Sequence, residues 1–206
     1  MSSRDLVLAR IRRAVGDPES VPVVREYRHG GDLTPGGPEL LDLLEDRLVD
    51  YRAAVRRTTP AGIAAAVRSV LDEHHADRVA VPAGLDPGWV PGATVDDGTL
   101  SADELDELDA VVTGCAVAIA ETGTIVLDAS PDQGRRIISL IPDLHVCIVA
   151  SDDVVQLVPE ALTRLDPQSP MTLISGPSAT SDIELQRVEG VHGPRRLEVV
   201  LVDSRQ

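Results

Sequence analysis

Apolar residues recur at helical spacing near the beginning of the chain. Leu6, Val7, Ile11 and Val15 predict a short amphipathic helix over residues 5–15. Residues 16–38 follow with four prolines, five glycines and few apolar positions, a composition typical of an arm rather than a core. We therefore predict an N-terminal helix and arm over 1–38. Such an arm can pack on a partner subunit or on its own domain.

The helical pattern resumes where a compact domain, residues 39–206, is predicted to begin. One long helix is indicated by an apolar face that runs from Leu41 to Val55 and by arginines near its end at 52, 56 and 57. Thr59 is placed to cap a second helix, with Pro60 at its first position. The buried face of that second helix is Ile63, Val67, Val70 and Leu71.

The remaining apolar runs are short enough to be buried strands. We expect strands in residues 77–82, 110–120, 125–127, 145–150, 171–174 and 197–202, and helices in 101–105 and 154–165. Ser101 and Glu104 form the pattern of a capping box at the start of the first of these helices. Because helices and buried strands alternate, the sequence predicts an α/β fold with a mainly parallel sheet covered by helices on both faces.

Composition narrows the chemistry. Aromatic residues make up only 1% of the chain, so the core must consist of Val, Leu, Ile and Ala. The net charge is −15 and every basic residue is arginine, which removes lysine-based Schiff-base and P-loop mechanisms and disfavours nucleic-acid binding. Cys115 and Cys147 lie in apolar runs without a Cys-x-x-Cys spacing, so we expect no iron–sulfur or zinc site in this chain. The sequence shows neither a signal-peptide pattern nor a membrane-length apolar run, which predicts a cytoplasmic protein.

The first candidate site is the loop Glu121-Thr122-Gly123-Thr124 between two apolar strands. Glycine allows close approach of a ligand to the backbone, and the two threonines offer hydroxyl donors. Glu121 is a candidate acid, base or nucleophile, whose pKa we expect to rise beside a buried strand. The alternative is a hairpin turn with a solvated glutamate.

Arg135 and Arg136 open an apolar stretch and form the second candidate. Either guanidinium could bind a carboxylate or phosphate with two hydrogen bonds. The alternative is that they balance the acidic surface or pair with Asp128 or Asp132.

The third candidate is the segment 175–184, which follows an expected strand and is expected to lead into a helix. Gly176, Ser178 and Thr180 suit an anion or carbonyl site at a helix N-terminus. Ser181 and Glu184 instead fit a capping box, and Asp182 would repel a phosphate. His192, in a turn flanked by glycines, could serve as an acid, a base or a ligand, or could simply bond to the backbone. An oxygen–nitrogen metal site of Asp182, Glu184 and His192 is conceivable but its spacing is not diagnostic, and His145, at the start of a strand, fits a structural role.

These segments, in this order, resemble the LUD-domain family of lactate utilization proteins. The resemblance covers residues 40–202 and is most specific in two blocks. The matching stretches are Ala120-Glu121-Thr122-Gly123-Thr124, Arg135-Arg136 with Leu140-Ile141-Pro142-Asp143-Leu144-His145, Ser175-Gly176-Pro177-Ser178-Ala179-Thr180-Ser181-Asp182-Ile183-Glu184, and Gly190-Val191-His192-Gly193-Pro194-Arg195. The two blocks most specific for the family are residues 175–184 and 190–195.

The resemblance implies a Rossmann-like sheet similar to sugar-phosphate isomerases and CoA transferases. It also implies a role beside the iron–sulfur lactate utilization proteins A and B, which would carry the clusters while L-lactate is oxidised to pyruvate. The first hypothesis is therefore an accessory subunit whose cleft binds a small carboxylate through Arg135. The alternatives are an independent CoA-transferase-like enzyme with Glu121 as acyl acceptor, and a ligand-binding or regulatory protein. A homo-oligomer is compatible with each.

Overall fold

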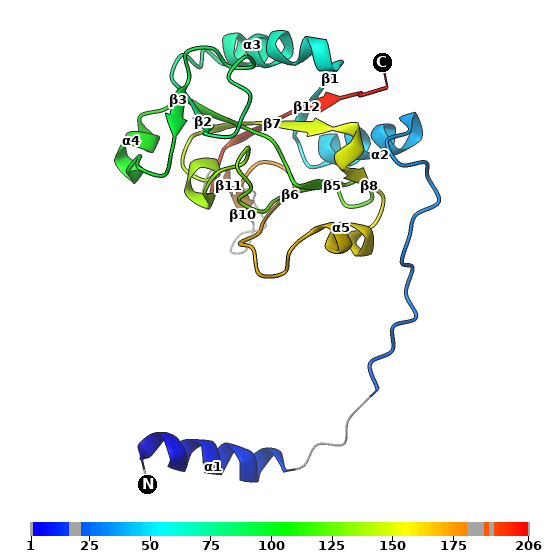
Figure 1. Ribbon diagram of the computed structural model, residues 1–206, viewed down its shortest axis with the longest axis vertical. Helices are drawn as coiled ribbons and strands as arrows, with labels where there is room; N and C mark the ends of the chain where they lie inside the picture. Colours follow the sequence, from blue (N-terminus) through cyan, green and yellow to red (C-terminus); the bar gives the residue numbers. More distant parts are fainter. Residues whose placement is uncertain (1, 17–21, 181–187, 190–191, 206) are drawn as a thin grey trace.

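A computed structural model describes residues 2–16, 22–180, 188–189 and 192–205. It consists of an α/β body and an arm that leads away from the body to helix α1 (Ser3–Val15) (Figure 1). The body contains a large parallel sheet, a smaller second sheet and helices packed against both.

The large sheet has six strands in the order β1-β12-β7-β4-β2-β3, and every neighbouring pair is parallel. This confirms the mainly parallel α/β fold predicted from the sequence. Its strands β12, β7, β4 and β2 are almost wholly buried, which is why they appear as continuous apolar runs. The six strands are β1 (Ala54–Thr58), β2 (Val79–Pro82), β3 (Thr94–Asp96), β4 (Ala110–Thr113), β7 (Leu144–Ala150) and β12 (Arg196–Val202).

The two faces of the large sheet bury different cores. Helix α3 (Ile63–Glu73) covers one face, where Val67 and Val70 pack with Val146 and Ile148 of β7. Helix α2 (Pro38–Asp50) and part of the second sheet cover the other face, where four leucines pack with alternate residues of β7 and β12. The alternation along β7 follows from the two-residue period of a strand.

The second sheet has four strands in the order β8-β5-β6-β9, and helix α5 (Val158–Arg164) lies against its outer side (Figure 1). Its strands β5 and β6 form an antiparallel hairpin, and β6 pairs antiparallel with β9. The strands are β5 (Val117–Ile119), β6 (Thr124–Leu127), β8 (Val154–Val155) and β9 (Thr172–Ile174).

Three elements predicted from the sequence have different boundaries in the structure. The apolar run 110–120 is two strands, β4 and β5, which belong to different sheets, because apolarity alone does not reveal a change of sheet. The long helix ends at Asp50, where Arg52 takes a φ of 67°, and the following residues form β1 instead of another helical turn. The helix expected over 154–165 is β8 followed by α5, with a proline in the first turn of α5.

The shorter elements complete the body. Helix α4 (Ala102–Asp106) begins with the predicted capping box, in which Ser101 and Glu104 bond reciprocally. Pro60 begins a 3-10 turn, but the Thr59 side chain forms no capping bond. Ala179 and Thr180, directly after Ser178, form a short strand, and the helix and capping box expected from Ser181 onward lie outside the described residues. The remaining elements are the 3-10 turns η1 (Pro60–Gly62), η2 (Arg136–Ser139) and η3 (Ser151–Asp153) and the paired strands β10 (Ala179–Thr180) and β11 (Val188–Glu189).

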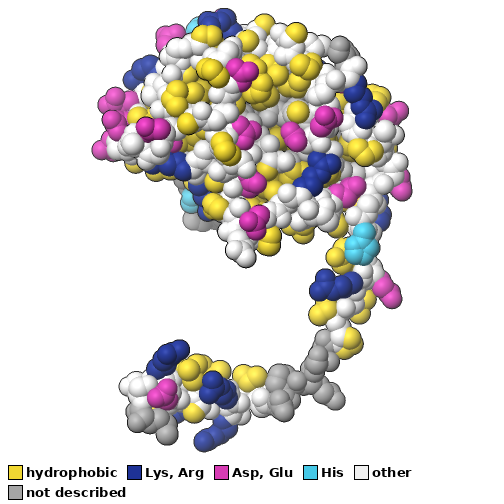
Figure 2. All heavy atoms as spheres, viewed as in Figure 1, with side chains coloured by type: hydrophobic (Ala, Val, Ile, Leu, Met, Phe, Trp, Pro, Cys, Tyr) yellow, Lys and Arg dark blue, Asp and Glu magenta, His cyan; other side chains and the backbone are white. Residues whose placement is uncertain are grey.

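Hydrogen bonds join the arm to the body close to where helix α2 begins. The Leu33 backbone N–H donates to Gln156 Oε1 at 2.9 Å, and Arg205 donates to the carbonyl of Pro35. At the other end, α1 (Ser3–Val15) buries none of its residues and carries four arginines and one aspartate. Figure 2 shows these cationic side chains apart from a body on which acidic side chains are widely spread.

Candidate functional site

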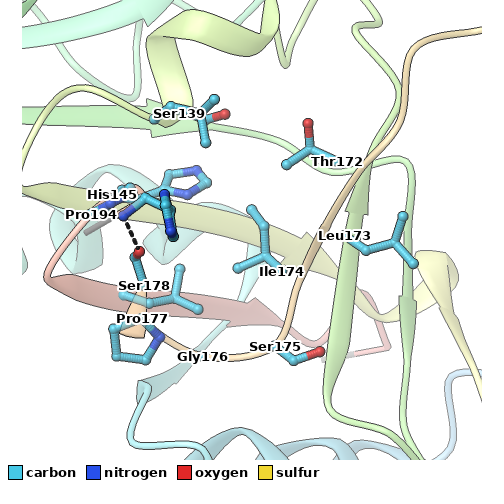
Figure 3. Close-up of a pocket in the computed structure, with 14 residues that line it drawn as sticks. Ser139, His145, Thr172, Leu173, Ile174, Ser175, Gly176, Pro177, Ser178 and Pro194 are labelled. Carbon is cyan, nitrogen blue, oxygen red and sulfur yellow. Dashed lines mark hydrogen bonds between the residues drawn. The ribbon is translucent and has the colours of Figure 1, made fainter. Parts of the chain in front are cut away.

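A pocket of about 260 Å³ lies where the amino ends of β7 and β12 meet strand β9 of the second sheet. Small-molecule sites occupy roughly 300–1,000 Å³, so this pocket suits a ligand smaller than a drug. Its walls combine aliphatic side chains and prolines with hydroxyls and two imidazoles (Figure 3). The polar residues that line it are Ser139, His145, Thr172, Ser175, Ser178 and His192.

The loop 175–178 forms one wall of the pocket, and its shape depends on glycine. Gly176 has a φ of 82°, and a Cβ there would lie 2.4 Å from the carbonyl oxygen of Tyr51. The loop is joined to the turn before β12 by two bonds: Ser178 N–H donates to the carbonyl of Pro194 at 2.9 Å, and His192 N–H donates to Ser178 Oγ at 3.0 Å. The two segments predicted to carry chemistry at the C-terminal end of the chain are thus one structural unit.

His145 forms the deepest polar group of the pocket. Its side chain is 1% exposed, and its Nε2 lies 2.8 Å from the Thr113 hydroxyl. Burial lowers the pKa of His145 to about 4, so the imidazole is neutral at pH 7. Figure 3 shows it among the residues that line the pocket, together with Ile174 and Pro194.

The adjacent arginines have different surroundings. Arg135 donates to both carboxylate oxygens of Asp96, at 2.7 and 2.9 Å, and to the carbonyl of Leu100. Asp96 is buried, so this ion pair fixes Arg135 to the body. Arg136 lines a small recess that shares Ser139 and Thr172 with the main pocket, and no ion pair joins it to another described residue. Of the two adjacent arginines, Arg136 is therefore the one that lies beside the pocket, whereas the sequence favoured Arg135 as the carboxylate partner.

The Glu121–Thr124 loop is the hairpin turn between β5 and β6, and it does not line the pocket. Arg28 of the arm donates to both Glu121 carboxylate oxygens, at 2.5 and 2.7 Å, and Gln156 donates a third bond at 3.1 Å. The Arg28 guanidinium lowers the pKa of Glu121, which corrects the expectation of a raised pKa. The sequence missed this because the partner is 93 residues away.

The two glycine loops nevertheless lie side by side. Thr124 Oγ1 and Ser175 Oγ are 2.9 Å apart and share a hydrogen bond, and Ile125 pairs with Ile174 in the sheet. Of the residues singled out from the sequence, Gly176, Ser178 and His192 line the pocket, and Arg136 adjoins it. Thr122, Gly123, Thr124, Glu121 and Arg135 lie outside its lining. Asp182 is outside the described residues, and of Thr180 only the backbone, in β10, is described.

Ser139, His145 and Thr172 line the pocket but were not proposed from the sequence. For His145 the sequence did hold a clue, since it is a histidine inside an otherwise apolar strand. A buried imidazole requires a polar partner. Within the described residues, no three His, Cys, Asp or Glu side chains gather as a metal site, and two of the three conceivable ligands, Asp182 and Glu184, are not described. In the same residues, no helix has the length and apolar character needed to cross a membrane.

The fold and the pocket define an α/β protein with a small pocket at the amino edge of its parallel sheet. The LUD domain family matches residues 51–202, and the chain belongs to that family. A Deinococcus radiodurans protein named Lactate utilization protein C is 47% identical over 205 residues, which cover 95% of this chain and 93% of the relative. A Bacillus subtilis protein of the same name is 26% identical over 220 residues, covering 88% of this chain and 91% of the relative.

A solved structure shares the fold. The crystal structure of a DUF162 family protein from Deinococcus radiodurans has a TM-score of 0.69 and 44% sequence identity to this chain. The superposition covers 80% of this chain and 96% of the solved chain.

Proposed function

We propose that this chain acts in lactate utilization as the non-redox subunit of an iron–sulfur system that oxidises L-lactate to pyruvate. The names of its relatives support the pathway. With two cysteines and no cluster-binding spacing, the chain leaves the electron-carrying clusters to its partners, the lactate utilization proteins A and B.

The observation that carries a ligand role is the pocket at β7, β9 and β12. Its size suits a small carboxylate, its hydroxyls supply hydrogen-bond donors, and Arg136 adjoins it through Ser139 and Thr172. Arg136 is itself exposed, so solvent screens the attraction of its charge for an anion, and the hydroxyls of the partly enclosed pocket supply the remaining hydrogen bonds. In this proposal Arg136 binds the ligand carboxylate, and Thr172 and Ser178 donate further hydrogen bonds.

Deletion of the gene tests the pathway role. We expect loss of growth on L-lactate, restored by the intact gene, and co-purification of the tagged chain with proteins A and B. Normal growth on L-lactate after clean deletion, with no second copy present, would contradict the proposal.

An Arg136→Ala variant tests the pocket. Because hydrogen bonds to charged groups contribute about 1.5–3 kcal/mol, calorimetry should show L-lactate and pyruvate binding weakened about 10- to 100-fold. Arg68→Ala is the matched control: it removes the same charge from α3, on the opposite face of the large sheet, and should leave binding unchanged. Equal affinities in the two variants would rule out Arg136 as the carboxylate ligand.

A further inference from the structure

The hydrogen bonds around Thr113 determine which nitrogen of His145 carries the proton. Thr113 Oγ1 lies 2.9 Å from the carbonyl oxygen of Gly114 and 2.8 Å from His145 Nε2. A carbonyl oxygen can only accept, and a threonine hydroxyl has a single hydrogen to donate. The Thr113 hydrogen therefore points to Gly114, and His145 Nε2 must carry a hydrogen that it donates to Thr113.

This arrangement leaves Nδ1 of His145 as a hydrogen-bond acceptor. The imidazole is neutral, so with the proton on Nε2 the other nitrogen has a free lone pair. No described residue donates to Nδ1, yet it is absent from the fully buried polar atoms without partners, which in the described residues are Arg56 Nε and Glu198 Oε2. Nδ1 therefore keeps a small accessible surface, and His145 is one of the residues that line the pocket.

We infer that His145 Nδ1 accepts a hydrogen bond from the C2 hydroxyl of a 2-hydroxy carboxylate, and that the pocket thereby selects the alcohol over the corresponding 2-oxo acid. The inference rests on the proposed carboxylate pocket and names its ligand class. The carboxylate lies towards Arg136 and Thr172, and the hydroxyl lies towards His145. A 2-oxo acid would direct a second lone pair at Nδ1, and an acid without the hydroxyl would leave Nδ1 unpaired.

The affinities of L-lactate, pyruvate and propionate for the full chain test this selection by calorimetry. One hydrogen bond between uncharged groups contributes about 0.5–1.5 kcal/mol, so L-lactate should bind about two- to tenfold more tightly than propionate and more tightly than pyruvate. Equal affinity for L-lactate and propionate would overturn the inference and leave the carboxylate pocket standing. Failure of all three to bind would overturn both.

Thr113 is the positioning residue in this scheme and provides a variant outside the pocket lining. Thr113→Val removes the acceptor that holds the Nε2 hydrogen, so the preference for L-lactate over propionate should fall towards one. Thr113→Ser keeps the hydroxyl and should retain the preference, as a matched control. An unchanged preference in the valine variant would contradict the role of Thr113.

The protonated nitrogen can also be read directly from the ¹⁵N spectrum of the labelled imidazole in the intact chain, which does not depend on any ligand. We expect hydrogen on Nε2 at pH 7. Hydrogen on Nδ1 would overturn the inference even if the Thr113 variants fail to fold.

Discussion

The Glu121–Thr124 loop and the Ser175–Ser178 loop have similar local chemistry but different relations to solvent. Each is a glycine turn with flanking hydroxyls, and the Thr124–Ser175 hydrogen bond joins them. The polar groups of the first loop are bound by the chain itself, since Arg28 and Gln156 bind Glu121 and Thr122 bonds to Thr124. The second loop forms a wall of the pocket.

The carboxylate of the first loop is therefore already paired with the arm and with Gln156. The serines of the second loop also bond to other segments, but that loop still faces the pocket. The glycines of the two loops differ in the same way. Gly123 packs against Arg47 of α2, whereas Gly176 shapes the pocket wall.

Substitution of the two glycines should give the largest effect. In Gly176→Ala, the left-handed conformation costs about 1–2 kcal/mol and the overlap with Tyr51 about 1–3 kcal/mol, a total loss of about 2–5 kcal/mol in unfolding free energy. Gly123→Ala, with its nearest contacts at 2.9 and 3.0 Å on Arg47, should lose less. Urea denaturation measures both, with Gly30→Ala as control because a Cβ there meets nothing within 4 Å. A smaller loss at Gly176 than at Gly123 would contradict the comparison.

The second-largest effect should be a loss of stability at low pH that depends on His145 in the pocket. His145 has a folded-state pKa of about 4 and an unfolded value near 6.5, so between these pH values the unfolded chain binds more protons and stability falls as the pH falls. From pH 7 to pH 4.5 the wild type should lose roughly 2–3 kcal/mol more than His145→Gln, which cannot take up that proton. Parallel acid dependence of the two proteins in urea denaturation would show that His145 is not buried in its neutral form.

Release of the arm should have the smallest effect on stability. Arg28 and Glu121 are 57% and 35% exposed, and such pairs contribute about 0.2–1 kcal/mol, so Arg28→Ala should lower the unfolding free energy by less than about 1 kcal/mol. Hydrogen exchange of the Leu33 amide should nevertheless accelerate, because its acceptor Gln156 also holds Glu121.

The same release should occur in the wild type at low pH. Arg28 lowers the pKa of Glu121, so the pair contributes stability above the ordinary carboxyl pKa and loses it as the pH falls through the lowered value. Arg68→Ala serves as the charge-matched control. An unchanged Leu33 exchange rate in Arg28→Ala would mean that this ion pair does not hold the arm.

The elements that depend on local patterns could be predicted from the sequence alone. The amphipathic faces of α2 and α3, the Ser101–Glu104 capping box and the apolar strands β7 and β12 all follow from residue spacing. The alternation of helices and buried strands was sufficient to predict the parallel sheet, because such strands need cover on both faces. The likeness to the LUD domain family was also readable from two blocks near the end of the chain.

The contacts between polar residues became visible only in the folded protein. Arg135 and Arg136 are neighbours in sequence, but one is bound to Asp96 while the other lies beside the pocket. Glu121 is paired with an arm residue 93 positions away, and His145 is joined to Thr113 across two strands of one sheet. Long-range packing sets these partners, and a hydrogen bond or ion pair between distant segments leaves no periodic signal in the sequence.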